Sequence, residues 1–130
     1  MRQIGQKIWN WKETIAVVVV IFYMSIVRVP SDVQQFFFPH FDKFVHFVCY
    51  LALSFVFMYN FGRVTSKTIF ISLFFSIIYG GIIELIQQYF LLLRTGDLYD
   101  FLSDIIGAII GVIIFLLIEK VFIKKHTNKN

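Results

Sequence analysis

A glutamate inside an otherwise apolar stretch is the residue of this sequence best placed to do chemistry. Glu84 is the only charged residue between Thr68 and Phe90. A carboxylate at bilayer depth costs at least ~2.5–3.5 kcal/mol, so it normally faces a helix bundle or water and marks a working site. Helical spacing places Gly80 and Gln87 on the same face as Glu84. We therefore expect this face to line a functional site.

Two further stripes of polar residues occur at helical spacing. Asp42 and His46 are four residues apart, with Tyr50 beside them, and Asp100 and Asp104 repeat the interval near the C-terminus. Residues four apart lie on one face of a helix, so each set forms a stripe. A histidine beside carboxylates suits general acid–base chemistry, and a mixed set of nitrogen and oxygen donors also suits a divalent metal.

The elements that must position these side chains are long apolar segments. The 130-residue chain is 58% hydrophobic and 15% charged, which is too apolar for a soluble domain of this size. A helix needs ~20 apolar residues to cross a bilayer. We therefore predict one all-α domain over residues 1–130, a polytopic membrane protein built as a bundle of four transmembrane helices. The predicted spans are residues 13–29, 44–62, 67–93 and 101–123.

Basic residues predict the orientation of these spans in the cell membrane. Positive charge stays in the cytoplasm, so both termini are predicted to be cytoplasmic and the loops 29–43 and 94–100 to face outward. The same flanking residues explain the net charge of +4, so we expect no nucleic-acid partner, and the single Cys49 excludes an internal disulfide. The flanking basic residues are Arg2, Lys7, Lys12, Arg63, Lys67, Lys120, Lys124, Lys125 and Lys129.

The depth of the polar residues predicts where the stripes meet. Glu84 lies roughly 9 Å below the end of its helix near Phe90, and His46 and Asp104 lie about one turn into their own helices. The predicted topology brings these three helix ends to the same side of the membrane. We therefore expect Glu84, His46 and Asp104 to converge in one shallow pocket that opens outward.

Purely structural roles are the alternative for the same residues. Asp42 and Asp100 each stand at a predicted helix start, where a short acid caps free N–H groups. A buried pair between His46 or an arginine and Glu84 would hold helices together without further function. The Gly107-x-x-x-Gly111 spacing permits close helix packing.

Three blocks of residues occur in an order that resembles the VanZ-like family of small bacterial membrane proteins. They are Asp42-Lys43-x-x-His46-Phe47-x-x-Tyr50, then Tyr79-Gly80-x-x-x-Glu84-x-x-Gln87, then Arg94 followed by Asp100-x-x-x-Asp104-x-x-Gly107. Two departures stand out. Asp104 replaces the family's usual Asn, and Leu92-Leu93 replaces the Pro-Gly often found before the arginine.

The resemblance implies a role at the cell envelope, because the family is named after a protein associated with teicoplanin resistance. It implies contact with a lipid-linked wall precursor or a lipoglycopeptide, but it supplies no established reaction and no cofactor. The binding positions that it implies are Asp42, Lys43, His46, Tyr50, Glu84, Gln87, Arg94, Asp100 and Asp104.

Three functions remain open at this point. In the first, Lys43 and Arg94 hold an anionic headgroup and the protein binds or modulates an envelope component. In the second, the protein is an enzyme on a lipid-linked phosphate or sugar, with Glu84 and His46 as the acid/base candidates. In the third, it is an envelope scaffold that docks through the Gly107 face.

The enzyme hypothesis has a metal-assisted form. A carboxylate-rich set with one imidazole suits Mg²⁺ or Mn²⁺. The candidate ligands are Asp42, His46, Glu84 and Asp104. The chain contains no phosphate-binding loop, no His-x-x-x-His pair and no Gly-x-Ser-x-Gly motif, so the common soluble catalytic templates are excluded.

Overall fold

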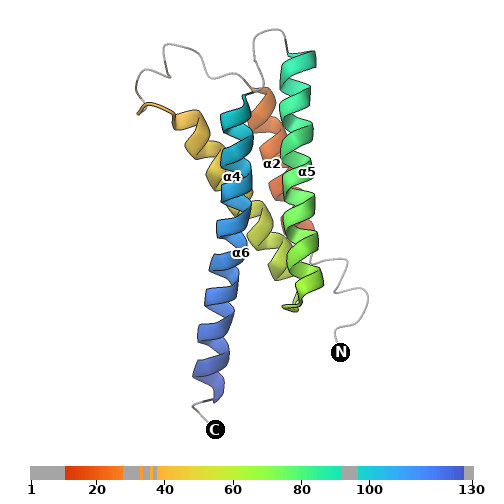
Figure 1. Cartoon of the computed structure of the whole chain (residues 1–130), viewed down its shortest axis with the longest axis vertical. Coiled ribbons are helices and arrows are strands. Elements are labelled where there is room, and N and C mark those ends of the chain that lie inside the picture. Colours follow the sequence, from red (N-terminus) through yellow and green to blue (C-terminus); the bar gives the residue numbers. More distant parts are fainter. Residues whose placement is uncertain (1–10, 28–32, 34–35, 37, 92–96, 128–130) are drawn as a thin grey trace.

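A computed structural model describes residues 11–27, 33, 36, 38–91 and 97–127. Within these ranges the chain is helical and contains no strand. The helices are α2 (Lys12–Ile26), α4 (Phe41–Phe61), α5 (Ser66–Phe90) and α6 (Leu98–Thr127), as Figure 1 shows. Three of them, α4, α5 and α6, are long and apolar enough to cross a membrane. The prediction of an all-α membrane protein is confirmed.

The helix ends differ from the predicted spans at several points. α4 begins at Phe41 rather than at 44, and α6 extends from Leu98 to Thr127 rather than over 101–123. Apolar runs mark only the part of a helix that sits in lipid, whereas helical hydrogen bonding continues into the polar flanks. α5 ends at Phe90, earlier than the predicted 93. α2 has 15 residues, about 22 Å, which is shorter than the ~30 Å hydrocarbon core.

A tight turn reverses the chain between α4 and α5. Gly62 follows α4 with a φ of 60°, a left-handed conformation that glycine adopts without steric cost. Thr65 then caps α5, because its hydroxyl accepts from the N–H of Thr68 and the Thr68 hydroxyl accepts from the N–H of Thr65. These local signals place α5 antiparallel to α4.

Two glycines bring α6 into close contact with α4. A Cβ on Gly107 would collide with the carbonyl oxygen of Phe47, and a Cβ on Gly111 would collide with the carbonyl oxygen of Leu51 and the hydroxyl of Ser54. The Ser54 hydroxyl also donates to the carbonyl of Ala108 at 2.8 Å. The interpretation of this glycine face as a docking surface for an envelope partner is therefore wrong, since α4 of the same chain already occupies it.

α2 is held against α4 and α5 by side-chain hydrogen bonds along its length. Asn60 donates to the hydroxyl of Thr14 at the start of α2. The Tyr79 hydroxyl donates to the carbonyl of Val18 at 2.8 Å. At the far end of α2, the Gln87 side chain donates to a main-chain carbonyl, that of Ser25. Such bonds between helices replace the hydrophobic force that is missing in lipid.

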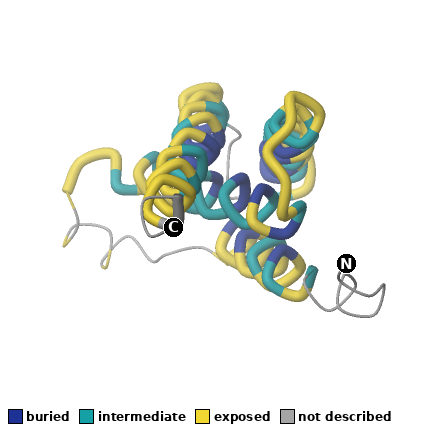
Figure 2. The backbone as a smooth tube through the Cα atoms, turned by 90° about the horizontal axis from the view of Figure 1, so that it is seen from below, coloured by how far each residue is buried: buried dark blue, intermediate teal, exposed yellow. Residues whose placement is uncertain are grey.

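The outer surface of the molecule is apolar, and its interior combines a small hydrophobic core with many polar side chains. Exposed residues form the outer surfaces of the helices, and buried residues face between them (Figure 2). The exposed side chains include Phe70, Phe74, Leu85, Ile106 and Leu117, whereas serines, acids and a histidine are buried. A water-soluble protein would reverse this order, so the outer surface fits a lipid environment.

Candidate functional site

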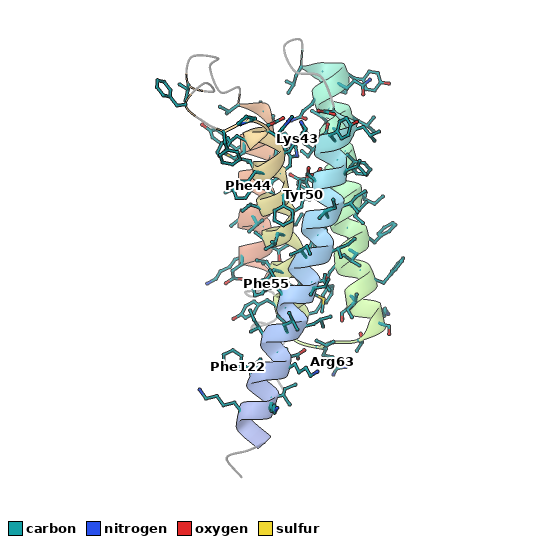
Figure 3. The ribbon with its side chains drawn as sticks, turned by 60° about the vertical axis from the view of Figure 1, so that its left-hand side comes forward. Lys43, Phe44, Tyr50, Phe55, Arg63 and Phe122 are labelled. Atoms are coloured by element: carbon teal, nitrogen blue, oxygen red, sulfur yellow. The ribbon has the colours of Figure 1, made fainter. Side chains whose placement is uncertain are left out.

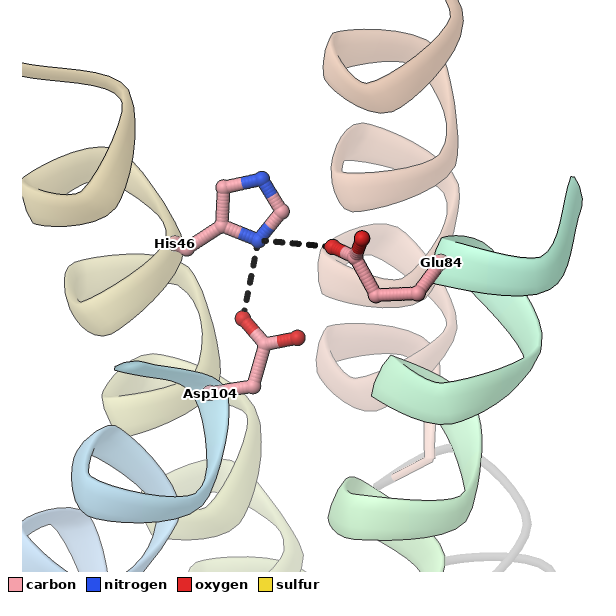
Figure 4. A group of neighbouring side chains, drawn as sticks. All are labelled: His46, Glu84 and Asp104. Carbon is pink, nitrogen blue, oxygen red and sulfur yellow. Dashed lines mark hydrogen bonds and ion pairs between the residues drawn. The ribbon is translucent and has the colours of Figure 1, made fainter. Parts of the chain in front are cut away.

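Side chains from three helices meet near one end of the bundle. His46 comes from α4, Glu84 from α5 and Asp104 from α6, as Figure 4 shows. The Nδ1 atom of His46 lies 2.9 Å from Oδ1 of Asp104 and 3.8 Å from Oε1 of Glu84. The prediction that His46, Glu84 and Asp104 converge is confirmed. We call His46, Glu84 and Asp104 the buried cluster.

The fold brings these residues together through small neighbours and parallel helices. α4 and α6 run in the same direction from the same end of the bundle, so His46 and Asp104 reach one level (Figure 1). Gly80 faces Asp104, and a Cβ there would lie 2.8 Å from Oδ2 of Asp104. α5 can therefore approach closely enough to place Glu84, one turn further along, at the same centre.

The buried cluster is almost free of solvent. His46 is 7% exposed, Glu84 8% and Asp104 0%. Among the described residues, Oε1 of Glu84 and Oδ2 of Asp104 have no hydrogen-bond partner although both are buried. Buried polar atoms in folded proteins are nearly always paired, so these unpaired carboxylate oxygens make the buried cluster a candidate site for a bound group.

A lysine network lies between the buried cluster and the end of the bundle. The Nζ atom of Lys43 lies 3.0–3.1 Å from a carboxylate oxygen of each of three acids. The acids are Asp42, Asp97 and Asp100. Figure 3 shows Lys43 at this end and Arg63 at the other. The lysine is neutralised by its own neighbours, so it does not present an open cation to an anionic headgroup, contrary to the hypothesis drawn from its sequence position.

Asp100 links the lysine network to the buried cluster. One of its oxygens lies 3.1 Å from Nζ of Lys43, and the other lies 3.9 Å from Nε2 of His46. The two nitrogens of His46 therefore face different acids. Asp100 is buried at 8% exposure, and it stands in the first turn of α6 instead of capping it.

Asp97 is the site residue that the sequence reasoning missed. Its main-chain N–H donates to Oε2 of Glu84 at 2.9 Å, and its carboxylate accepts from the N–H of Tyr99 and from Lys43. These bonds, first that of Tyr99 and then that of Lys43, hold the pKa of Asp97 below its usual value. Aspartate is favoured at helix N-caps, so Asp97 could have revealed the true start of α6.

The remaining predicted residues fall into different places. Tyr50 is buried beside His46 with the two rings stacked at 6.5 Å, and its hydroxyl has no hydrogen-bond partner in the part of the chain that the structure describes. Gln87 donates to the carbonyl of Ser25 in α2 and thus joins two helices. Asp42 is exposed and pairs with Lys43, so it does not belong with the proposed metal ligands. Arg94 lies outside the described residues.

Comparison with protein families gives a match over nearly the full chain. Residues 3–119 match the family described as VanZ/LLP1. The chain belongs to this family. The resemblance seen in the sequence is thereby confirmed, and with the three candidate spans it identifies a membrane protein. No curated protein and no solved structure matches the chain.

Asp104, one of the two departures from the VanZ-like pattern, lies inside the buried cluster. Asp104, where an asparagine is usual, supplies the oxygen nearest to Nδ1 of His46. An asparagine oxygen could accept the same hydrogen bond but would carry no charge. This chain therefore has one more negative charge at the cluster than the resemblance leads one to expect.

The arrangement supports two kinds of chemistry. His46 lies within hydrogen-bonding distance of Asp104, which is the geometry of a histidine oriented by a carboxylate for proton transfer. His46, Glu84 and Asp104 also each offer one donor atom such that all three atoms lie within 4.8 Å of one another. This spacing is compatible with ligands that share a metal ion.

Proposed function

We propose that this VanZ-like membrane protein acts at the outer face of the cytoplasmic membrane, where it binds or modulates a lipid-linked component of the cell envelope through the buried cluster. The observation that carries the proposal is the pair of buried carboxylate oxygens of Glu84 and Asp104 that no described residue pairs with. Ionisable groups inside a membrane bundle are costly to keep and are normally retained for function.

The charge distribution supports the outward orientation. The described basic residues near the α4–α5 turn include Arg63 and Lys67, and Lys120, Lys124 and Lys125 lie near the end of α6. Positive flanks stay in the cytoplasm, so the opposite end, which carries the lysine network, faces outward. In this proposal α2 crosses the membrane with the other helices, and both termini are cytoplasmic.

The apolar outer surface supports a lipid-linked ligand. Phe70, Leu85 and Ile106 are exposed on α5 and α6. A polyprenyl or acyl chain could lie along such side chains while its polar head reaches the acids at the end of the bundle. Lys43 is already paired with three acids. The polar head is therefore expected to bind by donating hydrogen bonds from its hydroxyl or amide groups to the carboxylates. If the protein occupies or alters this lipid-linked envelope component, a role in lipoglycopeptide resistance of the teicoplanin type would follow.

An enzyme on a lipid-linked phosphate or sugar is the second candidate. The 2.9 Å distance between Nδ1 of His46 and Oδ1 of Asp104 favours it, because a carboxylate-oriented imidazole can transfer protons. In this version His46 is the acid/base group, Asp104 orients it, and Glu84 is the second acidic group.

Substitution of the buried cluster tests the proposal. Glu84→Gln, His46→Ala and Asp104→Ala should each abolish complementation of a strain that lacks the protein, measured as lipoglycopeptide susceptibility. Glu84→Gln is the sharpest variant, since it keeps shape and hydrogen bonding while removing the charge. Full activity of all three variants would show that the buried cluster is not the functional site.

Membrane abundance separates loss of function from loss of structure. Breaking a buried ion pair can cost ~3–5 kcal/mol, so each variant is quantified in membranes by immunoblot. Glu119→Gln is the matched control, because it makes the same change on α6 at a distance of 15 residues, about 22 Å, from Asp104. A variant that fails to complement although its membrane abundance is normal supports the proposal. A variant whose membrane abundance falls indicates that the substituted residue belongs to a structural ion pair.

A further inference from the structure

The buried cluster has the composition and spacing of a divalent metal site. One imidazole nitrogen and two carboxylate oxygens, from His46, Glu84 and Asp104, lie within 4.8 Å of one another. Ligand atoms about 2.1 Å from one ion lie at most roughly 4.2 Å apart, so a movement of about half an ångström would close the set. Rotation of a carboxylate side chain supplies a movement of that size.

Protonation of His46 alone would not give every buried carboxylate oxygen of this cluster a partner. An imidazolium would donate its Nδ1 proton to Asp104 at 2.9 Å, and Oε1 of Glu84 would remain at 3.8 Å, beyond hydrogen-bonding distance. Oε1 of Glu84 and Oδ2 of Asp104 would then stay unpaired in the interior. A divalent cation would satisfy the carboxylates and offset both negative charges in the low-dielectric interior.

The other nitrogen of His46 faces an acid that lies just beyond hydrogen-bonding distance and that a small side-chain movement would bring within it. Nε2 lies 3.9 Å from Oδ2 of Asp100. Histidines that bind metal normally donate their second N–H to a carboxylate or a carbonyl, which fixes the tautomer. Asp100 is itself oriented by Lys43 at 3.1 Å. Of the three acids around His46, Asp104 and Glu84 thus lie beside the ligating nitrogen Nδ1, and Asp100 lies beside Nε2.

We propose that His46, Glu84 and Asp104 bind one divalent cation of the Mn²⁺ or Zn²⁺ type, through Nδ1 of His46 and one oxygen of each acid. Ions of this class accept both imidazole and carboxylate ligands. Three protein ligands leave coordination positions open, which is the pattern of a catalytic site and not of a closed structural one. The acids of the lysine network, at the end of the bundle, would attract cations towards the site.

This inference deepens the proposed function because it concerns the same side chains and would supply a cofactor for an action on a phosphate or sugar. Metal binding is measured directly, so either idea can fail without the other. If the cluster variants lose complementation but the parent protein binds no metal, only the metal inference is overturned. If the parent binds metal but the variants complement fully, only the proposed function is overturned.

The test is Mn²⁺ binding to the full chain in detergent after treatment with a chelator. Electron paramagnetic resonance of free Mn²⁺ should show one bound ion per chain that Zn²⁺ displaces. Glu84→Gln, Asp104→Asn and His46→Ala should weaken binding more than about 100-fold, and Asp100→Asn about 10–100-fold as an outer-sphere partner. Glu119→Gln should bind as the parent does. Circular dichroism checks that each variant is folded.

The parent protein alone also decides the matter if a variant does not fold. Pulsed resonance of the bound Mn²⁺ should show coupling to a nitrogen nucleus, because Nδ1 of His46 is a ligand. The proposal is overturned by the absence of a stoichiometric site, by a bound ion without nitrogen coupling, or by folded Glu84→Gln and Asp104→Asn variants that bind Mn²⁺ as tightly as the parent.

Discussion

Asp104 and Asp97 illustrate how acids in one small region take different roles. Asp104 is fully buried and faces His46, whereas Asp97 is partly exposed and ties the start of α6 to Glu84 and Lys43. The polar periodicity of each helix predicted that His46, Glu84 and Asp104 would meet. It could not predict the pairing of Lys43, because three acids compete for this lysine and only the packing of α4 against α6 decides the outcome.

Removal of the Lys43 charge should destabilise the fold moderately. Lys43→Met leaves three carboxylates close together without their cation, and we expect a loss of about 1–2 kcal/mol in the free energy of unfolding, since the lysine is only partly buried. Thermal unfolding in detergent measures this loss. Lys67→Met, at an exposed lysine near the opposite end of the bundle, is the control. Equal shifts in melting temperature for Lys43→Met and Lys67→Met would contradict a stabilising role of the lysine network.

Asp97 should make stability depend on pH in acid. Its folded pKa lies below the ordinary value of 3.8, so its charge stabilises the fold above that value and the contribution is lost as the pH falls through the folded pKa. Asp97→Asn keeps a capping acceptor but removes the charge. We expect the variant to melt below the parent at pH 7 and the difference to shrink progressively as the pH falls below 3.8. A difference that does not change with pH would contradict this account.

The four helices were recognisable from apolar runs, but their ends were not. α4 and α6 each begin three residues before the predicted span, because the helical hydrogen bonding continues into the polar flank. In α4 the added turn contains Asp42 and Lys43, and in α6 the carbonyl of Asp97 accepts the first helical bonds. The Gly107-x-x-x-Gly111 spacing predicted close helix packing but not the partner. That partner is α4, and it was identified only by the contacts of Phe47 and Leu51.

Gly107 should be essential for the packing of α6 on α4. Gly107→Ala places a Cβ against the carbonyl oxygen of Phe47, a backbone atom that cannot move alone, so we expect a loss of about 1–3 kcal/mol. Gly81→Ala is the control. Its Cβ would meet only the Phe101 ring at 3.6 Å, an ordinary contact, and alanine favours the helix. Unfolding in detergent should separate the two variants, and similar stabilities would refute the assigned contact.

The distribution of charge and apolar surface over the bundle gives the protein two unlike ends. The lysine network and the buried cluster occupy one end, and Arg63 and Lys67 lie near the other (Figure 3). Hydropathy and the positive-inside rule predicted this division from the sequence. The apolar exterior follows for the same reason, since lipid replaces water as the solvent of the outer helix faces.

Cysteine labelling tests the orientation of the two ends. In a Cys49→Ala background, an impermeant thiol reagent should label Phe38→Cys in intact cells, because residue 38 is exposed near the end of the bundle that we propose to face outward. Thr65→Cys, in the α4–α5 turn, should react only after permeabilisation. Labelling of position 65 in intact cells would reverse the orientation and with it the outward site.

Native mass spectrometry of the full chain, purified in mild detergent from bacterial membranes, tests most directly whether the buried cluster serves a lipid-linked ligand. The parent and Glu119→Gln should retain a species with the mass of a lipid-linked phosphate or sugar, and Glu84→Gln should retain much less of it. A parent protein without any such species, or equal retention by Glu84→Gln, would contradict the proposed role of the cluster.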